Sequence, residues 1–406
     1  MDVSPAPPWA ELPDAVLLGI VRRIPCAFDR AHVGEICRSW RRTLLQIPPP
    51  RPLPGILLLT PHGPTLSFVV AGDAWCTHPV FVPEAFRRAR YFGSYDDSWL
   101  FLAVGQDNGH VLFNLTDSQE EELPNWGTFQ LHDRELEAEI LLVAATLSSS
   151  PNVHGSVAGG ILTADLPPAN SMEHIAFWRT GSDVMSKTIR TSGVGLLEDV
   201  AYHDEAFHFL TLDDIIVVCR ASMAEPWSPG KIVVVDEVNV SIELGNITPR
   251  DELGYRDLRI VASYLVESRN DLLMVEKLAP NLLSPASAFR VFQMIKERLH
   301  DGQVHYSWEE LTTKLDGRML FVGQGCSRSY EAANYPGLDA GVYFLDDRST
   351  RHDPKIPFQG ARARRYLCSD NGKWSGTPPQ IKLCVHGSRP IEPLSSRLAF
   401  PLRRQF

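Results

Sequence analysis

Short apolar runs recur along residues 55–406, at intervals that leave no room for long helices. Turn-forming residues separate them, and the chain contains 28 Gly and 31 Pro among its 406 residues. Short runs bounded by such residues predict β-strands. The predicted strands cover residues 56–59, 66–70, 99–104, 110–115, 175–179, 200–202, 207–210, 215–219, 232–235, 258–266, 272–276, 289–295, 319–322 and 342–345.

Three connections between these runs have the chemistry of β-hairpins, which predicts mostly antiparallel sheets. They are Asp107-Asn108-Gly109, His203-Asp204-Glu205 and Ser268-Arg269-Asn270-Asp271. About 350 residues are too many for one sandwich or barrel, whereas four-stranded blades repeated around an axis accommodate this length. We therefore predict an all-β propeller and leave its blade count open. Because there is no WD signature and only one Gly pair, at 159–160, neither a standard WD nor a standard kelch array is predicted.

The first 54 residues have a different character. Residues 1–8 are predicted to be disordered, residues 9–47 to be helical, and the Pro-rich segment 48–54 to be an extended linker, because proline disfavours helix. Pro13 suits the first turn of a helix that Pro25 ends, and Asp29 is the predicted N-cap of a second helix. The apolar positions of the first helix are Val16, Leu17, Ile20, Val21 and Ile24, and those of the second are Val33, Ile36, Cys37, Trp40 and Leu44.

The helical segment resembles an F-box. A Leu12-Pro13 start precedes a Leu/Ile-rich helix, and Ile36-Cys37-Arg38-Ser39-Trp40-Arg41 closes the segment, with Ile36 in place of the usual Val. The resemblance implies a three-helix module that binds the Skp-type adaptor of a cullin ubiquitin ligase. The residues carried over to that interface, or to its supporting core, are Leu12, Pro13, Val16, Leu17, Ile20, Ile24, Val33, Ile36, Cys37 and Trp40.

The large segment resembles the plant KIB-type, kelch-related β-propeller domain. The motifs that carry the resemblance lie in order over residues 55–350, and segments 125–170 and 350–406 match poorly. They include Gly93-Ser94, Asp199-Val200-Ala201-Tyr202, Tyr264-Leu265-Val266-Glu267-Ser268, Ser327-Arg328-Ser329 and Tyr335-Pro336-Gly337-Leu338. The predicted fold class is thus α + β and multidomain, with an N-terminal three-helix F-box (9–47) followed by a mostly antiparallel propeller (55–406). Such a combination is typical of a large plant family.

The net charge and the absence of catalytic and metal-binding motifs argue against several classes of function. The net charge of −10 argues against a general nucleic-acid-binding surface, and no apolar run is long enough for a membrane helix. Neither HExxH nor GxSxG occurs, and Gly323-Gln324-Gly325 stops short of a GxGxxG loop and predicts a tight turn. Seven cysteines without a CxxC pair predict neither a disulfide framework nor a zinc site. No catalytic residue, metal or cofactor is therefore predicted, and a reducing, intracellular location in the nucleus or cytoplasm is expected.

The resemblances imply a substrate-recognition subunit of an SCF-type E3 ubiquitin ligase, which is not itself an enzyme. Its expected partners are the Skp-type adaptor, through it a cullin, and a target protein whose identity the sequence does not reveal. One alternative is a propeller scaffold or inhibitor without ligase work, which adaptor binding distinguishes. Another is a propeller that binds a small molecule, which a ligand-dependent thermal shift would reveal.

Overall fold

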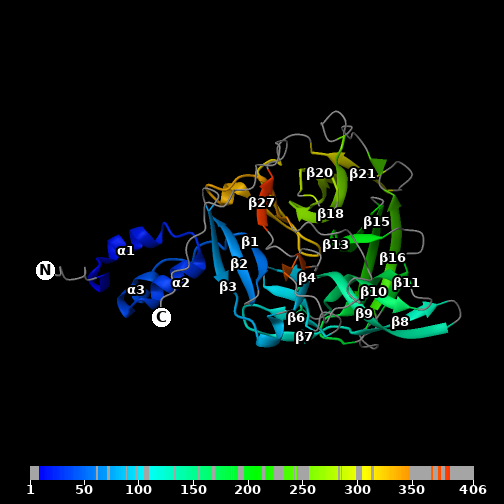
Figure 1. The fold of residues 1–406 in the computed structure, drawn as a ribbon, viewed down its shortest axis with the longest axis horizontal. Helices are drawn as coiled ribbons and strands as arrows, with labels where there is room; N and C mark the ends of the chain where they lie inside the picture. Colours follow the sequence, from blue (N-terminus) through cyan, green and yellow to red (C-terminus); the bar gives the residue numbers. More distant parts are fainter. Residues whose placement is uncertain are drawn as a thin grey trace.

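The computed structural model shows three helices beside a ring of β-sheets (Figure 1). It describes residues 9–60, 63–70, 74–87, 89–96, 98–104, 109–131, 134–153, 155–166, 170–183, 185, 187–190, 196–212, 215–223, 232–241, 243–244, 256–281, 284, 286–298, 304–311 and 315–346, and short strands within 367–384. The segment 1–8, which was predicted to be disordered, lies outside the described residues.

The N-terminal helices are shorter than their apolar periodicity predicts. They are the 3-10 turn η1 (Trp9–Glu11) and the helices α1 (Asp14–Val21), α2 (Ala27–Glu35) and α3 (Arg38–Leu44). Ile24 was wrongly placed in the first helix, because tight turns follow Val21. The prediction of Asp29 as an N-cap is also wrong, since Cys26 occupies that position and Asp29 lies in the first turn of α2. An extended Cys37, with φ −158° and ψ 168°, divides the predicted second helix into α2 and α3.

A small core holds α1, α2 and α3 together, and we call residues 9–47 the helical module. Leu17, Val21 and Trp40 are buried at its centre. The indole Nε1 of Trp40 donates to the carbonyl of Trp9 at 3.0 Å, and the hydroxyl of Thr43 donates to Asp14 Oδ1 at 2.8 Å. Both bonds join the last helix to the start of the module, which explains how a segment with so few apolar residues keeps a defined shape.

The first three sheets use the chain from residue 55 to residue 190. The first sheet is β1–β2–β3, the second is β4–β5–β6–β7, and the third has the order β12–β11–β10–β9–β8. Their bounds are β1 (Gly55–Thr60), β2 (Gly63–Val70), β3 (Ala74–Pro79), β4 (Arg90–Tyr95), β5 (Trp99–Ala103), β6 (His110–Asn114), β7 (Glu120–Glu122), β8 (Trp126–Leu131), β9 (Arg134–Leu147), β10 (Val157–Leu166), β11 (Asn170–Arg179) and β12 (Lys187–Arg190).

Three further sheets follow. The fourth is β13–β14–β15–β16, the fifth has the order β17–β21–β20–β19–β18, and the sixth has the order β23–β22–β24–β27. Their bounds are β13 (Leu197–His203), β14 (Ala206–Thr211), β15 (Ile215–Met223), β16 (Ile232–Ser241), β17 (Glu243–Leu244), β18 (Arg259–Ser268), β19 (Asp271–Ala279), β20 (Ala288–Arg298), β21 (Val304–Glu310), β22 (Arg318–Val322), β23 (Arg328–Glu331), β24 (Gly341–Asp346) and β27 (Gln380–Cys384), with a separate pair β25 (Leu367–Cys368) and β26 (Trp374–Ser375). The short 3-10 turns are η2 (Glu84–Phe86) and η3 (Ala332–Asn334). Among the described pairings, β17/β21 and β22/β24 are parallel and the others antiparallel.

Buried apolar clusters join these six sheets in sequence and then close the circle. Separate clusters lie between the first and second sheets, the second and third, the third and fourth, the fourth and fifth, and the fifth and sixth. A further cluster packs Met319, Phe321 and Tyr343 of the sixth sheet with Ile56 of the first. Each sheet thus buries both faces against its neighbours, as in a β-propeller, and the described residues provide six blades.

Every predicted strand falls within a described strand or within one residue of it. Two of the predicted hairpins are also confirmed. Asp204 and Glu205 have φ values of 47° and 58°, and Arg269 and Asn270 have 54° and 66°, as two-residue hairpin turns with positive φ require. Most of the third predicted hairpin, residues 107–108, lies outside the described residues. The sequence did not predict β3, β4, β7, β8, β9, β10, β12, β17, β21, β23, β25, β26 and β27.

Candidate functional site

Inner strands of five sheets meet around a cavity of about 330 Å³ at the centre of the ring. We call this cavity the hub mouth. Its lining comes from β4, β9, β13, β18, β23 and the turn before β23. The lining residues are Tyr95, Asp96, Thr146, Leu147, Ser148, Val200, Ala201, Tyr202, Leu265, Glu267, Gly325, Ser327, Arg328 and Ser329. A site shared by five sheets is a usual place for a propeller to bind a ligand or partner, because loop and strand-end side chains converge there.

The turn at residues 323–327 crosses the floor of the hub mouth. Its form is local: the amide of Cys326 donates to the carbonyl of Gly323 at 3.0 Å, and so does the hydroxyl of Ser327, also at 3.0 Å. This confirms the predicted tight turn. The amide of Ser94 on β4 donates to the carbonyl of Gly325 at 3.2 Å, so the turn also ties the sixth sheet to the second.

The carboxyl group of Asp199, on β13 of the fourth sheet, also binds this turn. Its Oδ1 accepts from the amides of Gly325 at 2.7 Å and Val200 at 2.8 Å, and its Oδ2 accepts from the amide of Leu265 at 2.8 Å. One buried carboxyl group therefore joins the fourth, fifth and sixth sheets. Complete burial raises the pKa of Asp199 to about 7, although the three N–H donors act in the opposite direction.

The rim of the hub mouth is polar and carries charges of both signs. Arg328 donates from Nη2 to the carbonyl of Ser94 and from Nη1 to that of Ser327, both at 2.9 Å, so its guanidinium is fixed in place. Asp96 and Glu267 are exposed acids on the same rim. Burial raises the pKa of Tyr95, which therefore keeps its phenolic proton at neutral pH. A rim of this kind suits hydrogen bonding to a peptide segment rather than burial of a purely apolar ligand.

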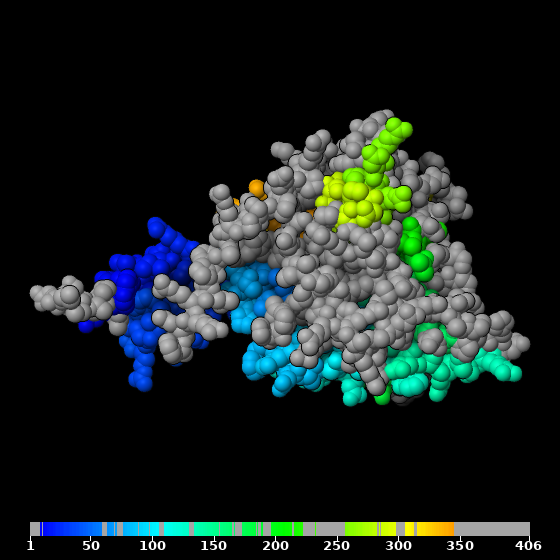
Figure 2. Space-filling model, viewed as in Figure 1, coloured from blue at the N-terminus to red at the C-terminus, as the bar shows by residue number. Residues whose placement is uncertain are grey.

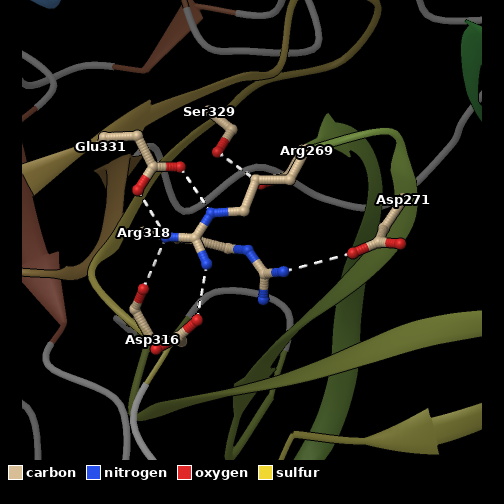
Figure 3. A network of polar contacts seen from close by, with 7 residues as sticks. Arg269, Asp271, Asp316, Arg318, Ser329 and Glu331 are labelled. Atoms are coloured by element: carbon tan, nitrogen blue, oxygen red, sulfur yellow. Dashed lines mark hydrogen bonds and ion pairs between the residues drawn. The ribbon is translucent and has the colours of Figure 1, made fainter.

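An ion-pair network next to the hub mouth joins the fifth and sixth sheets (Figure 3). Arg269, in the β18–β19 turn, donates from Nε to Glu331 Oε1 and from Nη1 to Asp316 Oδ2, both at 2.6 Å. The hydroxyls of Ser268 and Ser329 lie 2.8 Å apart beside it. These bonds to two carboxylates raise the pKa of Arg269 and lower that of Glu331.

Arg269→Lys is expected to lower the free energy of unfolding by about 1 kcal/mol at low salt, because one ammonium group cannot bond both carboxylates as the planar guanidinium does. Lys tolerates the positive φ of this turn no worse than Arg does, so the change isolates the charge geometry. Urea denaturation at low and high salt measures the loss, which should shrink at high salt. Lys296→Ala, which breaks the simpler exposed pair with Asp204, is the control and should cost less. A loss that does not depend on salt would contradict this account.

A second cavity, of about 630 Å³, lies between the fourth and fifth sheets. His203, His208, Arg220 and Lys296 contribute to its lining. His208 is buried, and its desolvation lowers its pKa to about 4, so this imidazole is neutral at physiological pH. Residues of two neighbouring sheets line this cavity, whereas residues of five sheets line the hub mouth.

The ten residues predicted for adaptor binding divide into three groups in the structure. Leu17 and Trp40 are buried in the core of the helical module, and Leu12, Ile24, Val33 and Cys37 are half-buried. The exposed group comprises Pro13, Val16, Ile20 and Ile36. Val16 and Ile20 share one face of α1, and Pro13, the N-cap residue of this helix, precedes Val16 by three residues. These four exposed residues are thus the part of the prediction that is available for contact with another chain.

The sequence did not identify the residues of the hub mouth as a site, although several of them belong to the motifs that carry the resemblance to the KIB-type domain. Asp199 and Arg328 are separated by more than a hundred residues, and nothing local shows that both reach the same axis. The available signal was a pair of adjacent acids, Glu198 and Asp199, between the apolar residues Leu197 and Val200. A strand acid that is fully buried needs hydrogen-bond partners, and for Asp199 two of the three are backbone amides of other sheets.

Six sheets that close into a ring define the chain as a β-propeller protein. Residues 68–366 match the KIB1-4 beta-propeller family, and the chain belongs to this family. The prediction that the large segment is a KIB-type propeller is therefore confirmed, and the family supports a role as a protein-interaction module. No curated protein matches the chain. Within the described residues, no helix combines the length and the apolar character needed to cross a membrane.

Proposed function

We propose that this protein is the substrate-recognition subunit of an SCF-type E3 ubiquitin ligase. In this proposal the helical module is an F-box that binds a Skp-type adaptor and, through it, a cullin. The propeller binds the target protein at the hub mouth. The chain itself catalyses nothing; it raises the effective concentration of a target lysine near the ubiquitin-loaded enzyme. The proposal includes origin in the plant family that combines these two modules, and action in the nucleus or cytoplasm.

The distribution of exposed apolar side chains carries the proposal. Ten large apolar side chains are exposed in the described part of the chain, and six of them belong to residues 9–47. They are Trp9, Val16, Ile20, Phe28, Ile36 and Leu45. The helical module projects from the propeller at one end of the molecule (Figure 2). A projecting module rich in exposed apolar side chains is typical of a protein-binding surface.

The test is binding of a purified Skp-type adaptor to the full chain. Val16→Asp combined with Ile20→Asp is expected to reduce adaptor affinity at least about thirtyfold, because charges replace two exposed apolar contacts. These side chains are 49% and 43% exposed, so the free energy of unfolding should change little. Calorimetry or co-purification gives the readout, and circular dichroism checks the fold.

Val153→Asp combined with Leu196→Asp is the matched control. These propeller side chains are 52% and 39% exposed, so the control adds the same charges to equally accessible positions. It should leave adaptor affinity unchanged. A wild-type chain that binds no adaptor would favour the alternative of a propeller scaffold or inhibitor. A double variant of the helical module that binds like wild type would show that these positions do not contact the adaptor.

A further inference from the structure

Four side chains of the kind that bind metals meet where the helical module contacts the first sheet. Cys26 and Asp29 come from the start of α2, and Cys76 and His78 come from β3. One potential ligand atom from each residue lies within 4.8 Å of all the others. Cys26 and His78 are buried, and Cys76 is half-buried.

Local structure explains why each pair presents both ligands on one side. Cys26 and Asp29 are three residues apart at the first turn of a helix, so they share a face. Cys76 and His78 are two residues apart in a strand, so they also share a face. A negative charge in the first turn stabilises a helix through its dipole, so the helix dipole alone could explain Asp29. That effect does not account for two thiols and an imidazole gathered around it.

The distances already approach those of a tetrahedral site. Cys26 Sγ lies 3.2 Å from His78 Nε2, and His78 Nε2 lies 3.6 Å from Asp29 Oδ1. In a tetrahedral zinc site, with bonds of about 2.0–2.3 Å, ligand atoms are roughly 3.3–3.8 Å apart. No separation among the four ligand atoms exceeds 4.8 Å, so none is more than about 1 Å beyond that range, which a side-chain rotation can close.

The surroundings also suit a bound metal. The ring of Phe28 stacks on His78, with centroids 5.1 Å apart and an interplanar angle of 16°, and Phe68 packs against Phe28 at 5.6 Å. These rings pack against one side of the imidazole and hold its orientation. The side chain of Asp29 is 45% exposed, which leaves an entry path for an ion.

We propose that Cys26, Asp29, Cys76 and His78 form a structural Zn²⁺ site that joins the helical module to the propeller. Two thiolates, one imidazole and one carboxylate are a set that zinc accepts in tetrahedral geometry, whereas Mg²⁺ and Ca²⁺ prefer oxygen ligands. Four protein ligands leave no open position, so the site is structural rather than catalytic. The sequence predicted no metal because the two ligand pairs are about fifty residues apart and match no familiar zinc spacing.

Zinc would replace the protons of both thiols, so binding releases two protons as the two Zn–S bonds form. The bound ion would fix α2 against β3 and hold the helical module at one angle to the ring. This inference does not depend on the ligase proposal, since a scaffold would use the same connection.

The experiment uses the full chain, purified without a polyhistidine tag and kept reduced. Elemental analysis is expected to find one zinc per chain. After chelation, one equivalent of Co²⁺ should give the thiolate-to-cobalt charge-transfer band and the visible bands of tetrahedral cobalt. Cys26→Ser and Cys76→Ser should each weaken cobalt binding at least about tenfold and remove the charge-transfer intensity of one thiolate. Chelation should lower the melting temperature of wild type but not of these variants.

Two variants keep the test decisive if a cysteine change disturbs folding. Asp29→Asn alters the most exposed ligand and should weaken cobalt binding while the circular dichroism spectrum stays that of wild type. Cys219→Ala removes a buried thiol of the fourth sheet that lies outside the cluster, and it should bind cobalt like wild type. Reduced wild-type protein that binds no stoichiometric metal would overturn the proposal. So would a Cys26–Cys76 disulfide, found by peptide mass analysis without reductant, in protein that takes up no metal once reduced.

Discussion

Asp199→Asn is expected to lower the free energy of unfolding of the propeller by about 3 kcal/mol. The carboxyl group accepts from the amides of Gly325, Val200 and Leu265 with its two oxygens. An amide side chain has one acceptor oxygen and one NH₂ group. Whichever way it turns, it therefore directs a donor at a buried N–H that belongs to another sheet. Urea denaturation followed by tryptophan fluorescence measures the loss.

Asp204→Asn is the matched control for this change. Asp204 lies on the same hairpin, five residues later, but it is exposed and forms an ion pair with Lys296 at 2.7 Å. The same substitution there should cost less than about 1 kcal/mol. Equal losses at the two positions would show that Asp199 does not connect the sheets as described.

The effect of Asp199→Asn should also depend on pH. The pKa of Asp199 is raised from 3.8 to about 7 because burial disfavours its charged form. A group with a raised pKa contributes stability fully below its unfolded value, here about 4, and loses that contribution as the pH rises through about 7. The difference in stability between wild type and variant should therefore shrink by about 1 kcal/mol or more from pH 5 to pH 8. A difference that widens with pH would mean that the three amides keep the group ionised.

Gly325→Ala is expected to destabilise the propeller by about 3 kcal/mol or more. Gly325 has φ +66°, and an added Cβ would lie 3.0 Å from the carbonyl of Phe92 and 3.1 Å from backbone atoms of Ala145. Those atoms belong to the inner strands of the second and third sheets, so they cannot move without disturbing the ring. Chemical denaturation and the melting temperature both report the effect.

Gly317→Ala separates the cost of the positive φ from the cost of the close backbone contacts. Gly317 also has a positive φ, +78°, but the nearest atom to its added Cβ is the end of the Arg269 side chain at 4.0 Å. Only the conformational cost remains there, which is about 1 kcal/mol. If both variants lose the same stability, close approach at the hub is not what requires glycine at position 325.

Together these predictions assign different structural and binding roles to different parts of the chain. The turn at residues 323–327 and Asp199 hold the sheets of the ring together beneath the hub mouth. The helical module carries most of the exposed apolar side chains, and the cluster around His78 lies where that module meets the first sheet. Changes at the hub should therefore reduce propeller stability and leave the proposed adaptor surface of the helical module intact. Changes at Val16 and Ile20 should do the reverse.

Local signals in the sequence determined the elements of the ring. Apolar runs bounded by turn residues located β13 and β18 of the five inner strands that line the hub mouth, but not β4, β9 or β23. Asp204-Glu205 and Arg269-Asn270 fixed the register of two hairpins. The signal failed at β9, where Arg134–Leu147 is rich in Glu, Leu and Ala, which favour helix. Pairing with β8 and β10 on both sides overrides that preference, because a strand inside a sheet gains hydrogen bonds and burial that its own sequence does not specify.

Among the helices, the prediction from apolar periodicity is wrong at Cys37. The apolar residues from Val33 to Leu44 keep a helical period, so sequence alone predicts one helix. The chain instead extends at Cys37, which lets α3 turn back and place Trp40 against Leu17 and Val21. Periodicity records which side chains are buried, but the direction of burial depends on packing between helices.

Only the tertiary structure brought distant residues into sites. The sequence shows Asp199, Gly325 and Arg328 as members of separate motifs, and it shows Cys26 and His78 as unrelated residues. The ring closes because its last sheet packs on its first, and that closure carries the turn at 323–327 to the axis. The contact between α2 and β3 likewise exists only once the helical module has docked. Spacing along a chain encodes local geometry, whereas these contacts depend on how whole sheets and helices pack, which no local pattern specifies.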